Sequence, residues 1–137
     1  MHSISVRSRQ REEFIDITKS IFDILSASGI EQGLCVVFVP HTTAAVTINE
    51  HADPDVVTDI LSGLRRLAAQ PDYRHQEGNS DAHLKASLLG SSASVPVDQG
   101  RLVLGTWQGI FLAEFDGPRQ RTVHLQIVPV PDLTRGR

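Results

Sequence analysis

The spacing of apolar residues divides the chain into predicted strands and helices. Alternation of apolar and polar positions, or a short apolar run bounded by turn residues, is typical of strands. Apolar residues three and four positions apart are typical of a helix that buries one face. The strands predicted in this way cover residues 3–7, 14–17, 34–39, 44–50, 94–97, 101–106, 109–115 and 121–130. The predicted helices cover residues 18–28, 54–67 and 83–89, and the longest polar loop covers residues 70–82.

Residues with strong local preferences mark the starts of these helices. Thr18 is expected to cap the first helix through its hydroxyl group. Asp53 and Pro54 combine a preferred N-cap residue with a proline at the first helical position. Asn79 or Ser80 is expected to cap the third helix. Each predicted helix therefore has a start signal as well as an apolar face.

The order of the elements indicates a single α+β domain that covers residues 1–137. Strands and helices follow one another as ββαββααβββ, with the helices clustered apart from the final run of strands. We therefore expect a mixed, largely antiparallel sheet with about three helices. The polar tail, residues 131–137, is expected to be frayed.

Composition excludes several classes of protein. The 137 residues carry a net charge of −3, which argues against a nucleic-acid binder with a broad basic surface. No apolar run approaches the roughly 20 residues that a membrane helix needs, and the first residues lack a secretory segment. We therefore expect a cytoplasmic protein that binds neither nucleic acid nor membrane. Six histidines accompany one cysteine, so a metal would be held by imidazole and carboxylate groups.

The first cluster of polar residues lies at the two ends of the predicted strand 44–50. His41 follows Pro40 at the end of the preceding strand, a place where functional side chains often lie. Glu50 shares a strand face with two apolar residues, and a carboxylate buried there would need a cation or a metal ion. Asp53 is better explained as the helix cap. This cluster therefore offers His41 and Glu50 as candidates for chemistry.

The second cluster is the loop that precedes the third helix. His75 and His83 bracket this loop, and together with Asp81 they are suitable ligands for a divalent ion such as Zn²⁺. The start of the helix, with Asn79 before it and Lys85 one turn further on, is also a candidate phosphate site. An ordinary ion pair between Asp81 and Lys85 is the alternative explanation.

The third cluster contains the most informative carboxylate in the chain. Glu114 interrupts an otherwise apolar strand, where it needs a positively charged partner or a metal ion. Arg119 or Arg121, across the predicted turn, could be that partner, and both a structural ion pair and a catalytic acid remain open. Arg119 could instead bind phosphate through its guanidinium group. Three histidines lie outside the clusters or at exposed positions, so we do not expect them to be metal ligands: His2, His51 and His124.

The polar residues of these clusters form three sequence blocks that cover nearly the whole chain in order. The blocks are His-Thr-Thr-Ala-Ala-Val-Thr-Ile-Asn-Glu at 41–50 with Asp53-Pro54, Gly78-Asn79 with Ala82-His83-Leu84-Lys85 and Leu89-Gly90, and Gly105-Thr106-Trp107-Gln108 with Glu114-Phe115-Asp116-Gly117-Pro118-Arg119. Together they resemble the YjbQ-like family of small proteins, which are regarded as secondary thiamine-phosphate synthases.

The resemblance implies an α+β fold, a homotrimer, and a polar pocket between subunits that holds a metal or an anion. The motif positions of the family fall on His41, His75, His83, Glu50, Asp53, Glu114, Asp116, Asn49, Asn79, Gln108 and Arg119, whereas His51 stands where the family pattern has asparagine. The implied reaction joins hydroxymethylpyrimidine diphosphate to a thiazole phosphate and gives thiamine phosphate and pyrophosphate.

We therefore expect a metal- or anion-binding enzyme, a transferase that acts on a small phosphorylated substrate. The expected catalytic residues are His41, Glu50 and Glu114, and the expected substrate- or phosphate-binding residues are Thr42, Thr43, Asn49, Asn79, Lys85, Gln108 and Arg119. A divalent metal, Zn²⁺ or Mg²⁺, would be held by His41, His75, His83 and Asp81. The alternatives are a metal-dependent hydrolase built on the three histidines and a non-catalytic ligand-binding trimer.

Overall fold

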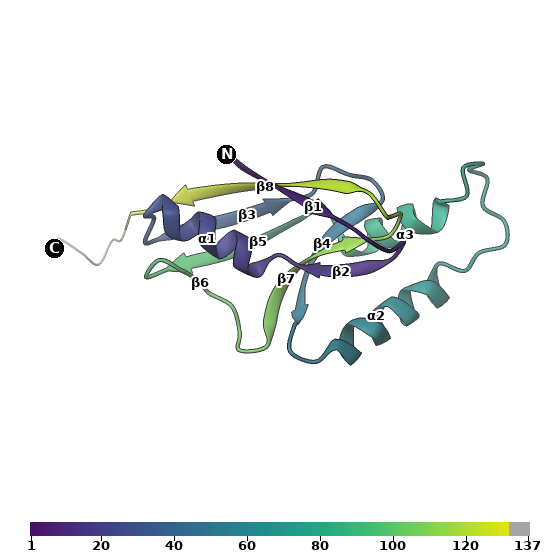
Figure 1. Cartoon of the computed structure of the whole chain (residues 1–137), viewed down its shortest axis with the longest axis horizontal. Coiled ribbons are helices and arrows are strands. Elements are labelled where there is room, and N and C mark those ends of the chain that lie inside the picture. The colour runs from purple at the N-terminus through teal and green to yellow at the C-terminus, as the bar shows by residue number, and fades with distance from the viewer. Residues whose placement is uncertain (132–137) are drawn as a thin grey trace.

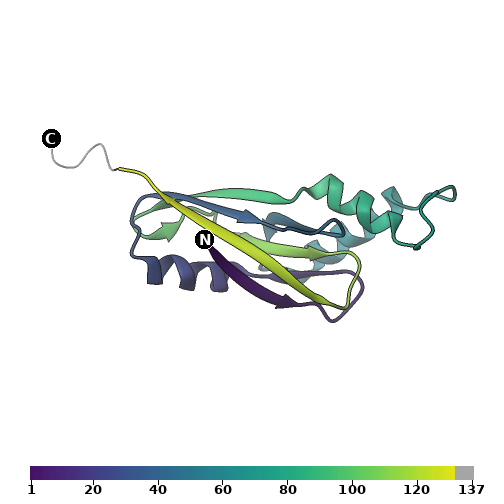
Figure 2. The ribbon, with the colours of Figure 1, turned by 90° about the horizontal axis from the view of Figure 1, so that it is seen from above.

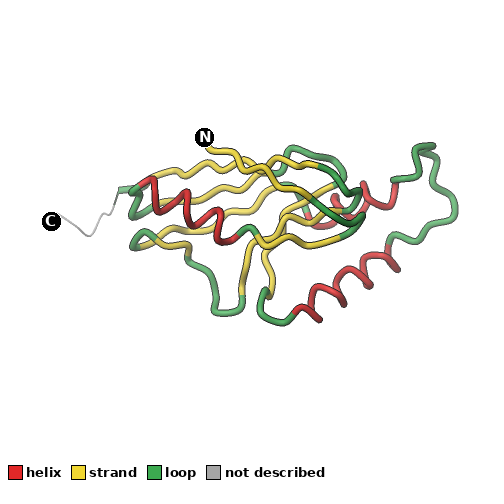
Figure 3. Tube along the Cα trace, in the orientation of Figure 1, coloured by secondary structure: helices red, strands yellow, loops and turns green. Residues whose placement is uncertain are grey.

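In the part of the chain that the structure describes, the fold consists of eight strands and three helices in one domain. The computed structural model describes residues 1–131, and the tail prediction for residues 131–137 falls almost entirely outside this range. Figure 3 shows the elements along the chain trace. The strands are β1 (His2–Arg7), β2 (Glu13–Asp16), β3 (Gly33–Phe38), β4 (Ala44–Glu50), β5 (Ser92–Asp98), β6 (Arg101–Leu102), β7 (Gln108–Glu114) and β8 (Gln120–Pro129). The helices are α1 (Thr18–Ser28), α2 (Pro54–Leu67) and α3 (Ser80–Leu89).

The predicted α+β class and the order of elements are confirmed, and every strand pairing is antiparallel. The strands form two sheets rather than one. The larger sheet has the order β1-β8-β3-β5-β6, and the smaller one has the order β2-β7-β4. β7 is the central strand of the smaller sheet, as its nearly continuous apolar run predicts.

The main core lies between the two sheets and α1. Alternate residues of β3 and β8 point into it, including Val37 and Leu125, and Ile21 from α1 joins them. From the smaller sheet, Val46 and Leu112 close the other side. The alternation that predicts these strands therefore also identifies the buried face of each one.

A second, smaller core lies on the opposite face of β4 and β7. Ala45 and Ala113 lie side by side there and pack against α2 and α3, together with Phe115. Figures 1 and 2 show α2 and α3 at one end of the molecule and α1 at the other. The smaller sheet is thus covered on both faces, and its ends are the places where polar side chains gather.

Two local predictions about element ends are wrong, and a third holds only for the position of the residue. Thr18 does not cap α1, because its hydroxyl donates to Asp16 Oδ1 at 2.6 Å and accepts the Ile110 N–H. Asn79 occupies the predicted N-cap position of α3, but its side chain makes no capping hydrogen bond, since its amide group instead donates to Asp116. The predicted strand 101–106 ends at Leu102, where a bond from the Leu104 N–H to the Leu102 carbonyl turns the chain.

None of the helices within residues 1–131 is long and apolar enough to span a membrane.

Candidate functional site

Two neighbouring cavities meet at the loop between β3 and β4. They have volumes of about 500 Å³ and 470 Å³, and both are lined by His41, Thr42 and Ser91. The first cavity adds Arg119 and Arg121 to this shared wall. The second adds residues of α3 and its C-terminus, namely His83, Ala86, Ser87 and Gly90, together with Ala44. The first and second sequence clusters therefore contribute to one site.

A buried ion pair holds one wall of the first cavity. Glu114 is 0% exposed and Arg121 is 3% exposed, and Arg121 Nε lies 2.9 Å from Glu114 Oε1. Ser8 also donates to this carboxylate, at 2.7 Å. Burial opposes ionisation of Glu114, but the hydrogen bonds from Arg121 and Ser8 outweigh it and hold the pKa below its ordinary value. Glu114 therefore positions Arg121 and is itself closed off from the cavity.

The Arg121 guanidinium group also ties this ion pair to the polar loop. Its Nη2 donates to Thr43 Oγ1 at 2.8 Å, so Thr43 is buried as a partner of Arg121. A predicted substrate-binding residue thus contacts the cation that lines the cavity. Thr42, the neighbouring hydroxyl residue, is exposed and lines both cavities.

Arg119 is the exposed cation of the site. Its Nη2 lies 3.0 Å from Asp116 Oδ2, and its Nε donates to the Asp116 carbonyl. Asn79 donates to the same Asp116 oxygen, so the N-terminus of α3 is fastened to this turn. Asn79 Oδ1 is buried and has no partner within residues 1–131. The turn after β7 therefore orients the guanidinium group of Arg119.

His41 enters the site as a neutral imidazole. The Thr122 N–H donates to His41 Nε2 at 3.0 Å, so this nitrogen carries a lone pair and Nδ1 carries the proton. Burial, and next the positive charge of Arg121, hold the pKa of His41 below its ordinary value. The ring therefore offers one N–H donor, at Nδ1.

His41 is expected to stay neutral at pH 7 and to titrate below 6.5, the ordinary histidine pKa. Because the unfolded chain takes up this proton first, His41 should lower the free energy of unfolding as the pH falls below 6.5. The imidazole Cε1–H signal of His41, followed by NMR over pH 4–8, measures the midpoint. A midpoint above 6.5 would contradict the neutral tautomer.

The predicted metal trio is only partly brought together. His75 and His83 lie edge to face with ring centroids 5.7 Å apart, and His83 shares a cavity wall with His41. His75 lines a different cavity, beside Tyr73 and Lys85. Among residues 1–131, no three His, Cys, Asp or Glu side chains are arranged to hold a metal ion.

The chemistry of the four predicted ligands explains why a metal does not fit within one chain. His41 Nε2 already accepts a backbone hydrogen bond. Asp81 accepts two hydrogen bonds from Arg11, at 3.0 Å and 3.1 Å, and these hold its pKa well below the ordinary range. The predicted Zn²⁺ or Mg²⁺ site on His41, His75, His83 and Asp81 is therefore not formed by these residues.

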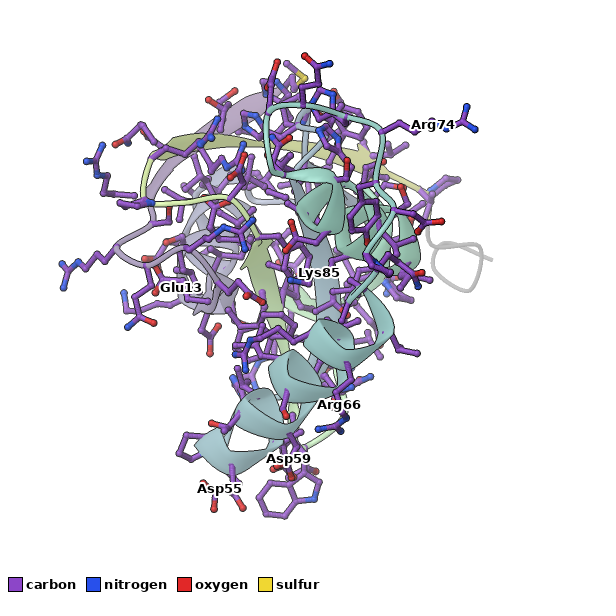
Figure 4. All side chains as sticks on the ribbon, turned by 90° about the vertical axis from the view of Figure 1, so that its right-hand side faces the viewer. Glu13, Asp55, Asp59, Arg66, Arg74 and Lys85 are labelled. Atoms are coloured by element: carbon purple, nitrogen blue, oxygen red, sulfur yellow. The ribbon has the colours of Figure 1, made fainter. Side chains whose placement is uncertain are left out.

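Lys85 belongs to a buried charge cluster behind the helix. It is 1% exposed, and its Nζ lies 3.1 Å from Asp81 and 3.2 Å from Glu12. Figure 4 shows Lys85 in the interior, in contrast to Arg74, which points away from the molecule. The alternative explanation of Asp81 and Lys85 as an i,i+4 ion pair is thus confirmed, with Glu12 as an additional partner that sequence spacing does not reveal.

Three predicted site residues lie at the far end of the smaller sheet. Ala44 pairs with Glu114 at one end of the β4–β7 ladder, and Glu50 pairs with Gln108 at the other end. Six residue steps of a strand separate the two ends by about 20 Å. Within one chain, Glu50, Asn49 and Gln108 are therefore separate from His41 and Glu114, and the predicted catalytic set is split.

Two residues of the site were not among the predicted ones. Ser91 follows the last turn of α3 and lines both cavities, and no sequence pattern distinguishes it from other loop serines. Ser8 bridges Glu114 and the Arg119 backbone from a position more than 100 residues away in the chain. The sequence predicts Arg121 only as a possible partner of Glu114, although its alternation with Val123 on the inner face of β8 places it beside the cavity.

These features define a small α+β domain in which an antiparallel sheet carries a cationic cavity at one end. The three sequence blocks identify the particular class. The chain belongs to the UPF0047 protein YjbQ-like family, whose pattern matches residues 2–130.

Relatives of known sequence and structure agree with this assignment. A UPF0047 protein of Methanocaldococcus jannaschii is 48% identical over 124 residues, which is 90% of each chain. The UPF0047 protein YugU of Bacillus subtilis is 44% identical and covers 93% of this chain and 98% of its own length. The crystal structure of a YjbQ/UPF0047 protein from Clostridium acetobutylicum superposes with a TM-score of 0.91 at 50% identity, covering 93% of this chain and all of that one.

Proposed function

We propose that the protein binds a phosphorylated small molecule in the two cavities at His41 and acts there as a transferase. The supporting observation is that Arg119 and Arg121 line one cavity, whereas their carboxylate partners, Asp116 and Glu114, do not line it. An anion in the cavity would therefore meet the positive groups first. Two arginines beside one cavity favour a ligand with more than one negative charge, a phosphate or diphosphate, over a single carboxylate.

Neutral donors complete this proposed anion site. Thr42 and Ser91 supply hydroxyl groups, and His41 supplies the Nδ1–H because its other nitrogen is engaged by Thr122. Such donors stabilise negative charge that develops on a leaving oxygen. The site thus has the groups that the departure of a pyrophosphate ion requires.

The presence of two joined cavities favours a reaction of two substrates. In the reaction that the family resemblance implies, the thiazole nitrogen attacks the methylene carbon of hydroxymethylpyrimidine diphosphate. A carbon–nitrogen bond forms, the carbon–oxygen bond breaks, and pyrophosphate leaves with the electron pair. The Arg119 cavity suits the diphosphate, and the cavity beside His83 suits the second substrate. Thiamine biosynthesis in the cytoplasm is therefore the proposed setting.

The purified protein is expected to form thiamine phosphate from the two precursors in the presence of Mg²⁺. His83→Ala should lower the rate about tenfold or more, because it removes a wall of the second cavity. His2→Ala, at an exposed position of β1, is the matched control and should leave the rate unchanged. Pyrophosphate binding without any product would instead indicate a non-catalytic ligand-binding protein, and equal rates in both variants would contradict the assignment of His83.

We also propose that the protein is a homotrimer that uses the outer face of the larger sheet. The middle of this face is apolar and exposed: Leu34 pairs with Val128 on one side and with Pro96 on the other, and all three are exposed. Contact through this face would bury apolar surface that a monomer leaves in water.

Leu34→Asp is expected to convert a trimer of about 45 kDa, three times the chain mass of 15.0 kDa, into monomers. A charge on this face would have to be desolvated without a partner. Light scattering coupled to size exclusion measures the mass. Leu67→Asp, at an exposed leucine of α2, is the control. A wild-type mass of 15.0 kDa, or an unchanged trimer in Leu34→Asp, would contradict the proposal.

A further inference from the structure

A separate cavity lies between α1, β6 and the end of β4, and shares no lining residue with the His41 cavities. Its volume is about 520 Å³. Cavities of roughly 300–1,000 Å³ accommodate typical small-molecule ligands. Figure 1 shows α1 and β6 near one end of the molecule, opposite α3. A ligand here would therefore be independent of the proposed transferase site.

The lining of this cavity combines an apolar floor with a positive side. Phe22, Leu102 and Leu104 supply the apolar surface, and Phe22 is 42% exposed. Arg101 and Lys19 supply the charge. Lys19 is already paired with Asp23 at 3.0 Å, whereas Arg101 makes no ion pair within residues 1–131. One uncompensated cation therefore remains beside the apolar floor.

The opposite wall is a fixed Asp16–His51 pair. Asp16 Oδ1 accepts the N–H and the hydroxyl of Thr18, and Asp16 Oδ2 lies 2.9 Å from His51 Nδ1. Burial opposes ionisation of Asp16, but the hydrogen bonds from Thr18 and His51 outweigh it and keep the pKa below its ordinary value. The carboxylate is thus ionised and oriented, and it leaves the imidazole with only Nε2 to contact a ligand.

The charges around the cavity select the kind of ligand. Asp16 and His51 also line an adjacent cavity of about 380 Å³, which carries Glu13, Glu50 and Asp53. This acidic side repels the negative end of a ligand and directs it toward Arg101. A dianionic phosphate group would face one unpaired cation and the nearby Asp16 carboxylate, so the balance favours a single negative charge.

We propose that this cavity binds a monocarboxylate with an aromatic or branched apolar body. The carboxylate pairs with Arg101, and the apolar body covers Phe22, Leu102 and Leu104. His51 and Asp16 form the polar wall that limits the depth of insertion. Neither the YjbQ-like resemblance nor the transferase proposal assigns this site.

Hydrocinnamate is a suitable probe, with the corresponding alcohol as its uncharged analogue and propanoate as its truncated one. Titration of the ¹⁵N-labelled protein should shift the backbone amides of Thr18, Leu102 and Leu104 in a saturable way. Hydrocinnamate is expected to bind about tenfold more tightly than either analogue, because each lacks one of the two contacts.

Arg101→Gln should weaken hydrocinnamate binding about tenfold and leave the binding of the alcohol unchanged. Arg74→Gln, at an arginine that points into solvent, is the matched control and should change neither. The proposal is overturned if hydrocinnamate produces no saturable shifts at these amides at millimolar concentration, if acid and alcohol bind equally, or if Arg101→Gln has no effect. These measurements report on the cavity lined by Arg101, which shares no lining residue with the His41 cavities, so the transferase proposal is tested separately.

Discussion

Replacing Glu114 by alanine is expected to lower the free energy of unfolding by about 3–5 kcal/mol. The substitution leaves the Arg121 guanidinium group buried without its carboxylate partner, and it removes one of the two acceptors of the Ser8 hydroxyl. An unpaired charge in the protein interior is one of the most destabilising changes that a single substitution can cause. Urea unfolding followed by circular dichroism measures this difference.

The double variant Glu114→Leu with Arg121→Met separates the unpaired charge from the loss of the side chain. Both charges are then replaced by apolar groups of similar size, so the double variant should be more stable than Glu114→Ala. If Glu114→Ala lowered the free energy of unfolding by less than about 1 kcal/mol, the Glu114–Arg121 ion pair would not be a major contribution to the stability of the fold. The catalytic interpretation of Glu114 would then need to be reconsidered.

Arg119→Gln is expected to weaken the binding of pyrophosphate about 10- to 100-fold. Arg119 is the half-exposed cation of the His41 cavities and is oriented by Asp116, so its loss removes a charge-assisted contact without unfolding the turn. Isothermal titration calorimetry at an ionic strength of about 0.15 M, where the Debye length is about 8 Å, measures the dissociation constant.

Arg74→Gln removes the same charge from an exposed loop and provides the control for net charge. It should change the affinity for pyrophosphate less than about threefold, because salt screens an exposed charge that lies more than a Debye length from the bound anion. Equal weakening in the two variants would mean that pyrophosphate responds only to the overall charge of the protein. Arg119 would then have no specific part in binding.

Most of the fold follows from short-range patterns in the sequence. The apolar run 109–115 predicts a central strand, and β7 is indeed paired on both edges. The Asp53–Pro54 signal predicts the start of α2, and Asp53 Oδ1 accepts the Asp55 N–H. These predictions succeed because the apolar run and the helix cap are each formed by residues that are close in the sequence. The Thr18 and Asn79 side chains make no capping bonds because they bond elsewhere: Thr18 to Asp16 and to the distant Ile110, and Asn79 to the distant Asp116.

The composition of the site was harder to predict, since it depends on which end of a strand each residue occupies. Glu50 and His41 are near each other in the sequence, yet β4 places them about 20 Å apart. The sequence predicts that Lys85 binds phosphate, but the carboxylate of Glu12, the residue directly before β2, forms an ion pair with it. His51 was discounted as an exposed loop residue, whereas its contact with Asp16 makes it the wall of a cavity.

The central claim is that the His41 cavities bind a phosphorylated ligand. The most direct test is a titration of the ¹⁵N-labelled wild-type protein with inorganic pyrophosphate, followed by NMR. The largest saturable shifts are expected at the backbone amides of Thr42, Ser91 and Arg119, which line these cavities. Shifts confined to the start of α3 around Ser80, or no saturable shifts at all, would contradict the account.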